Sequence, residues 1–192
     1  EIYTSLFAAA SDVYKRQLKA QEAFTVSVCA SGQHTDLLQT ALLDFGILPE
    51  HELKLMGHGQ TLASLTSKGI EGLDGLLAQT CPDMVLVHGD TTTALAASLC
   101  AFYRKIPVGH VEAGLRTGSL YSPFPEEFNR QAISRIATIN FAPTLQSIDN
   151  LLNEGIPKES IVLTGNTIVD AIERILHDIT QTENRKLIQA IE

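Results

Sequence analysis

Short apolar runs alternate with longer segments of helical periodicity along most of the chain, and this alternation limits the fold more than any other feature. The expected strands are residues 24–30, 83–88, 107–112, 138–142 and 160–164, with 52–56 as a weaker candidate. The expected helices between and after them are residues 33–45, 60–79, 91–103, a helix from Pro125, 148–152 and 165–177. Strands that alternate with helices predict an α/β fold with a doubly wound parallel sheet of the Rossmann-like type.

Composition excludes several classes of function. The 192 residues suit one domain, or one domain and the start of another. A net charge of −8 argues against nucleic acid as a partner, although a phosphorylated small ligand needs only local donors. The longest uncharged apolar stretch, residues 94–103, is too short to span a membrane. Three cysteines without CxxC spacing do not suggest a disulfide framework, so we expect a cytoplasmic protein.

Polar side chains gather where the expected strands end. The pairs His88-x-Asp90 and His110-x-Glu112 close two strands, and Glu126 begins a helix behind Pro125. Residues two apart on an extended chain face the same side, so neighbouring strands would bring all four groups of the pairs together. In an open α/β sheet this edge holds the ligand. Several acids at such an edge suggest proton-transfer chemistry.

The two histidine pairs have other interpretations. Histidine and carboxylate at this spacing can bind zinc or manganese, which would indicate a metal-dependent hydrolase. No further cluster of ligands follows in these loops, so we expect no metal. Each histidine could also be a strand-end residue held by hydrogen bonds.

The remaining polar residues are equally open to structural roles. Asp90 could be the N-cap of the helix that follows it, with the threonines in its first turn. Glu126 could be a solvated residue in a helix start. Arg116 and Arg130 could bind a diphosphate or a carboxylate, although a surface ion pair is the commoner role of an arginine.

Four segments carry a resemblance to a known family. They are VHGDTTT (87–93), VGHVEAGLRTG (108–118), YSPFPEEFNR (121–130) and TGNTIVDA (164–171). Together they resemble the non-hydrolysing UDP-N-acetylglucosamine 2-epimerases, over about residues 18–170. The resemblance implies a two-domain fold of the GT-B type, of which this chain holds the N-terminal half.

The resemblance also implies roles. Asp90, Glu112 and Glu126 match the family's acid/base carboxylates, which move a proton at C2 of the sugar while UDP leaves C1 and returns. The expected substrate-binding residues are Gln33, Gln60, His88, Gly89, Thr91, His110, Arg116 and Arg130. The family chemistry implies a UDP-sugar substrate, no cofactor, no metal and a homodimer.

The start of the chain departs from the family, whose members open with a strand and a Gly-Thr-Arg-Pro-Glu turn. Those positions fall at residues 3–7, and Ser5 stands in place of the arginine. We therefore expect residues 1–17 to supply neither that strand nor its helix, 18–178 to form the epimerase-like domain, and 179–192 to begin an interdomain region. A chain of this kind is expected to be inactive alone. A non-catalytic nucleotide-sugar-binding module is the alternative.

Overall fold

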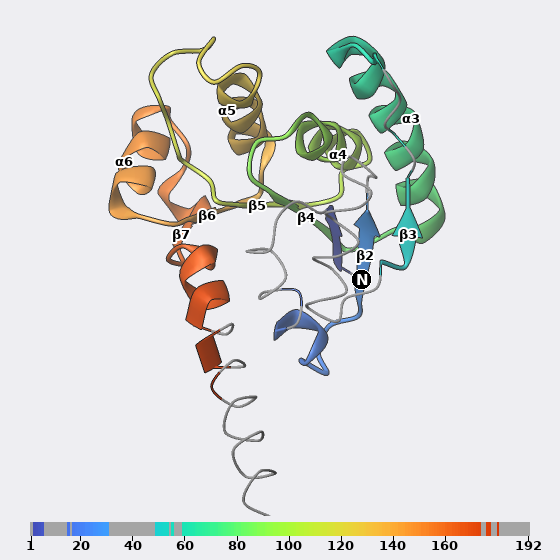
Figure 1. Cartoon of the computed structure of the whole chain (residues 1–192), viewed down its shortest axis with the longest axis horizontal. Coiled ribbons are helices and arrows are strands. Elements are labelled where there is room, and N and C mark those ends of the chain that lie inside the picture. The colour runs from blue at the N-terminus through green and yellow to red at the C-terminus, as the bar shows by residue number, and fades with distance from the viewer. Residues whose placement is uncertain are drawn as a thin grey trace, which may run out of the picture.

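A seven-stranded parallel sheet forms the centre of the computed structural model, which describes residues 2–5, 15, 17–30, 49–53, 55, 59–173, 176–177 and 180. The strand order is β3-β2-β1-β4-β5-β6-β7 (Figure 1). The strands are β1 (Ile2–Ser5), β2 (Val26–Ala30), β3 (His51–Glu52), β4 (Met84–His88), β5 (Val108–Val111), β6 (Ile139–Ala142) and β7 (Ile161–Leu163). The reversal of order beside β1 confirms the predicted doubly wound sheet.

The helices lie where helical periodicity predicts them. They are α3 (Leu62–Thr80), α4 (Thr92–Tyr103), α5 (Glu126–Ile136) and α6 (Leu145–Asn153), with a short 3-10 helix η1 (Lys158–Ser160). Helices α3, α4 and α5 cover one face of the sheet, and α6 packs beside β6 and β7 (Figure 1). Within the described ranges, no helix is long and apolar enough to cross a membrane.

Threonine caps fix the starts of three helices, because each hydroxyl accepts a hydrogen bond from an amide of the first turn. Thr61 caps α3, Thr91 caps α4 and Thr144 caps α6. Pro125 is the N-cap of α5 and not its first helical residue, which corrects the predicted start by one position. The helix predicted at residues 33–45 lies outside the described residues. Residues 167–173 are helical, as the sequence predicts.

The core lies between β4, β5 and α4. Val85, Leu86 and Val87 are consecutive and all buried, as expected for a strand covered on both faces. Small residues, Ala97 and Cys100 among them, let α4 approach the sheet closely.

The first strand is a correction to the sequence interpretation. Ile2–Ser5 forms β1, which pairs in parallel with β2 on one side and β4 on the other. Residues 17–19, which precede β2, are helical. Ladder hydrogen bonds use only backbone groups, so four residues unlike the family's opening strand can still fill this central position. Ser5 pairs with Val87 in register, at the point where the strand order reverses.

Candidate functional site

Two neighbouring strands deliver acids to the same edge of the sheet. His88 is the last residue of β4 and pairs in register with Val111, the last residue of β5. Asp90 follows β4 after Gly89, Glu112 follows β5 directly, and Glu126 opens α5. Burial raises the pKa of Asp90, and the charges of Glu126 and Glu112 add to the rise, so both of these carboxylates lie within electrostatic range of Asp90. Asp90, Glu112 and Glu126 are hereafter the carboxylate cluster.

Glu112 is held in place by a histidine from the neighbouring strand. His88 Nε2 lies 3.1 Å from Glu112 Oε2, and the His88 side chain is only 5% exposed. This contact lowers the pKa of Glu112 below its ordinary value, although burial opposes the shift. Glu112 has a φ of +64°, a region that costs free energy for a residue with a Cβ. Glu112 therefore contacts His88 from a strained backbone position at the end of β5.

The register of β4 and β5 explains why the two His-x-acid pairs do not converge as predicted. His110 pairs in register with Val87 and His88 with Val111, so the two histidines point to opposite faces of the sheet. Simple alternation would put Glu112 on the side of His110. The positive φ at Glu112 breaks the alternation, and its carboxylate meets His88.

His110 is fully buried in β5, and its predicted contact with substrate stays a prediction. It has no exposed area, and burial lowers its pKa to about 4. Its Nε2 lies 2.8 Å from the carbonyl oxygen of Gly89 and its Nδ1 lies 3.2 Å from Ser134 Oγ. The carbonyl only accepts, so in the neutral ring Nε2 donates to Gly89 and Nδ1 accepts from Ser134. His110 therefore fixes the turn that leads to Asp90.

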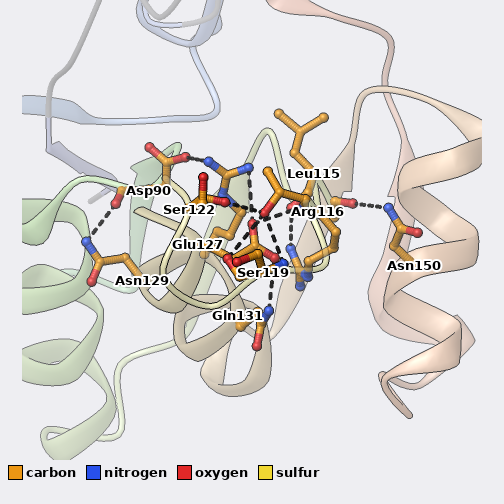
Figure 2. A network of polar contacts seen from close by, with 12 residues as sticks. Asp90, Leu115, Arg116, Ser119, Ser122, Glu127, Asn129, Gln131 and Asn150 are labelled. Carbon is orange, nitrogen blue, oxygen red and sulfur yellow. Dashed lines mark hydrogen bonds and ion pairs between the residues drawn. The ribbon is translucent and has the colours of Figure 1, made fainter. Parts of the chain in front are cut away.

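Asp90 is not the helix N-cap that the sequence offered as an alternative, because Thr91 accepts the hydrogen bond from Ala94 N and caps α4. The Asp90 carboxylate instead pairs with Arg130, and its carbonyl oxygen accepts from Asn129 Nδ2 at 2.8 Å (Figure 2). Burial raises the pKa of Asp90, and Arg130 offsets only part of that shift.

Arg116 forms a bidentate pair with Glu154, and its predicted contact with substrate stays a prediction. Its Nε and Nη2 lie 2.6 and 2.8 Å from the two carboxylate oxygens of Glu154, just after α6. Asn150 Nδ2 of α6 also donates to the Gly114 carbonyl oxygen at 2.9 Å (Figure 2). Gly114 has a φ of +87°, and an added Cβ would lie 2.3 Å from Ser147 O. Gly114, Arg116, Asn150 and Glu154 form what we name the loop junction.

Sequence reasoning missed Glu127, the buried acid next to Glu126. Its side chain has no exposed area and accepts from Thr117 N at 3.2 Å and Gln131 Nε2 at 3.0 Å (Figure 2). Burial raises the pKa of Glu127, but the hydrogen bonds from Gln131 and Thr117 outweigh it, and the pKa lies below its ordinary value. Helical spacing was the available signal, since Glu127, Arg130 and Gln131 share one face of α5.

The other predicted site residues are less informative. Gln33 lies outside the described residues. Gln60 directly precedes the N-cap of α3 and donates to Ser64 Oγ at 3.5 Å. Gly89 has a φ of +69°, and its amide donates to Val111 O. In the part of the chain that the structure describes, no three His, Cys, Asp or Glu side chains are grouped as a metal site would require.

Comparison with known proteins decides the family. Residues 16–191 match the family model described as UDP-N-acetylglucosamine 2-epimerase. The chain belongs to the UDP-N-acetylglucosamine 2-epimerase family. A UDP-N-acetylglucosamine 2-epimerase of Salmonella typhimurium is 54% identical over 149 residues, which are 78% of this chain and 40% of that protein. One from Neisseria meningitidis is 45% identical over 173 residues, 90% of this chain and 46% of that protein.

Solved epimerase structures share the fold. The crystal structure of the Neisseria meningitidis enzyme bound to UDP-GlcNAc matches with a TM-score of 0.91 and 42% identity, over 97% of this chain and 51% of that chain. A Methanocaldococcus jannaschii epimerase in complex with UDP-GlcNAc and UDP matches with a TM-score of 0.87 and 31% identity, over 97% of this chain and 52% of that chain. Acinetobacter baumannii MurG, at 18% identity and a TM-score of 0.62, shares the fold alone. The chain spans about half the length of these epimerases, which confirms the predicted N-terminal half of a GT-B-type fold.

Proposed function

We propose that the protein to which this chain belongs interconverts UDP-N-acetylglucosamine and UDP-N-acetylmannosamine, and that the carboxylate cluster moves the protons. Membership of the epimerase family supports the reaction class. The observation that carries the proposal is that Asp90 and Glu112 follow neighbouring strands at one edge of the sheet but lie in different surroundings. Burial raises the pKa of Asp90, whereas the contact with His88 lowers that of Glu112. Carboxyl groups whose environments push their pKa values apart are suited to act as acid and base.

The reaction requires one ionised carboxylate, as the base, and one protonated carboxyl group, as the acid, at the same time. The C2 proton of the sugar is not adjacent to a carbonyl, so a base removes it as the C1–O bond to UDP breaks. The electron pair of the C2–H bond forms a C1=C2 double bond, and UDP leaves with the C1–O pair. An acid then returns a proton to the other face of C2 while a UDP oxygen attacks C1. We assign the base to ionised Glu112 and the acid to Asp90, with Glu126 as a third carboxylate in reach.

The leaving UDP also needs cations near its diphosphate. Arg130, within the site, is already paired with Asp90. At the end of β1, where family members carry an arginine, this chain has Ser5. Position 5 is in register with Val87 beside the carboxyl end of β4, so we propose that a cation there is the missing contact with UDP. Loss of one such contact typically costs about a hundredfold or more in rate.

A hybrid enzyme tests the proposal. Residues 16–173 would replace the matching segment of the Salmonella typhimurium relative, which supplies its own first strand and second half. We expect conversion of UDP-N-acetylglucosamine, with uptake of one solvent deuterium at C2 in D2O, and we expect none from the 192-residue chain alone. A folded hybrid that binds UDP-N-acetylglucosamine but takes up no deuterium would favour a non-catalytic binding module.

A further inference from the structure

One buried carboxylate has no part in the chemistry proposed above. Glu127 is fully buried on the first turn of α5, while its neighbour Glu126 is half-buried. Ionised carboxylates are almost never fully buried unless they are paired. The partners of Glu127 are the Thr117 amide, the Gln131 side chain and the Arg130 guanidinium. Two of these are neutral, so Arg130 carries the only positive charge among the three.

Arg130 is shared between two carboxylates. One terminal nitrogen donates to Asp90 Oδ2, and the other lies 3.6 Å from Glu127 Oε2. The side chain is only 12% exposed, and its Nε is buried without a hydrogen-bond partner. Arg130 is thus fixed between its two acids and is not presented to solvent. A single positive charge that faces two acids stabilises the ionised form of each less than it would stabilise one alone.

We propose that Glu127 is a positioning residue of the site: it holds Arg130 between itself and Asp90, and so leaves Asp90 able to keep a proton. The importance of that proton rests on the function proposed above, whereas the sharing of Arg130 does not.

The charged groups around Asp90 determine how a substitution at Glu127 will shift the titration of Asp90. Arg130 and Glu126 act on it from α5 and Glu112 from the end of β5, while Glu127 contacts Arg130 and His88 contacts Glu112. Removal of the Glu127 charge leaves Arg130 to Asp90 alone and removes one nearby negative charge. Both effects favour the ionised form of Asp90, so their direction is the same.

Carboxyl NMR titration of the 192-residue chain tests this without any need for turnover. The Asp90 signal is identified by its loss in Asp90→Asn. In Glu127→Gln, an isosteric change that can still accept from the Thr117 amide, we expect the Asp90 titration midpoint to fall by about 0.5 pH unit or more. A purely structural Glu127 would lower the unfolding midpoint and leave the Asp90 titration unchanged. An unchanged or raised Asp90 midpoint overturns the proposal.

Two further measurements keep the proposal falsifiable. Glu154→Gln removes the same charge from the Arg116 pair, outside the contacts of Asp90, and is expected to leave the Asp90 midpoint unchanged. Arg130→Gln removes the shared cation, so it should raise the titration midpoints of both Asp90 and Glu127, whereas a cation that served Asp90 alone would leave Glu127 unchanged. This second measurement applies even if Glu127→Gln does not fold, and a Glu127 midpoint that stays in place overturns the sharing of Arg130. Inactivity of the hybrid enzyme with these shifts present would contradict only the proposed function.

Discussion

Arg116 and Arg130 lie on either side of one proline-rich turn, 14 positions apart, but they are paired in different ways. Arg116 places two nitrogens on Glu154 and a third on the Leu115 carbonyl oxygen, so its hydrogen bonding is largely satisfied. Arg130 has one carboxylate at hydrogen-bond distance, a second at 3.6 Å, and a buried Nε without a partner. The first pairing closes the loop junction. The second leaves charge unmatched beside the carboxylate cluster.

How each arginine is paired distinguishes a structural role from a functional one better than the residue type does. A one-to-one Arg–carboxylate pair with bidentate geometry mainly fixes a loop. Several carboxylates around one guanidinium perturb the protonation of each acid, and such perturbation is typical of functional sites. The same substitutions in the two regions should therefore have different consequences.

The largest expected effect separates the two regions by activity. In the hybrid enzyme, Glu112→Gln should lower kcat by about 1,000-fold or more, because the amide cannot take a proton. Glu154→Gln, the same change at the loop junction, should keep kcat within about threefold of the unchanged hybrid. Steady-state rates of epimerisation measure both. Comparable losses in the two variants would remove the distinction drawn here.

A glycine pair tests how tightly the loop junction is packed. Gly114→Ala should lower the free energy of unfolding by about 3 kcal/mol, since the new Cβ would overlap Ser147 O and φ is positive. Gly118 has a similar φ of +79° but open space around it, so Gly118→Ala measures the backbone strain alone, about 1 kcal/mol. Urea denaturation gives both values. Equal losses would mean that the contact with α6 yields at little cost.

The contribution of His110 to the free energy of unfolding should depend on pH. Burial lowers the pKa of His110 to about 4, below its unfolded value of about 6.5. Between these values the unfolded chain binds the extra proton, so stability is complete above pH 6.5 and falls as the pH drops toward 4. The loss should reach about 2 to 3 kcal/mol. His110→Gln retains a donor for Gly89 O and does not titrate, so its urea midpoint should fall less over this range.

The smallest expected effect concerns the loop junction pair itself. Glu154→Gln should cost about 1 kcal/mol of unfolding free energy, because Glu154 is one-third exposed and water can replace part of the pairing. Thermal unfolding at low and high salt measures it, and the difference should shrink in high salt. A loss that salt does not change would indicate that packing of the Arg116 stem, and not charge, holds the loop.

The fold was largely predictable from sequence because its signals are local. Apolar runs and helical periodicity located the strands and helices after residue 60 to within a few positions. The family segments located the carboxylate cluster. Local signals failed at β1, where pairing uses backbone groups and four residues of any suitable kind can serve.

The site was predictable only in part because strand register is not written in local sequence. His88 and His110 precede their acids by the same spacing, yet a one-residue offset between β4 and β5 puts them on opposite faces. The positive φ of Glu112 then reverses the expected side of one acid. Arg116 and Arg130 likewise differ in their tertiary contacts, which local sequence does not reveal. Such pairings depend on contacts across 24 to 40 positions of the chain.

The central place of β1 has a consequence for how the sheet can assemble. Without Ile2–Ser5, the order β3-β2-β1-β4-β5-β6-β7 would separate into a pair of strands on one side and four on the other. Each part would then expose a row of open backbone donors and acceptors at what is now the interior of the sheet. Residues Ile2–Ser5 must therefore wait for β4, some eighty positions later, before their ladder is complete on both sides. Until β4 has been made, the open edge of the unfinished sheet can pair with other chains. Because β1 has only four residues, that edge is short.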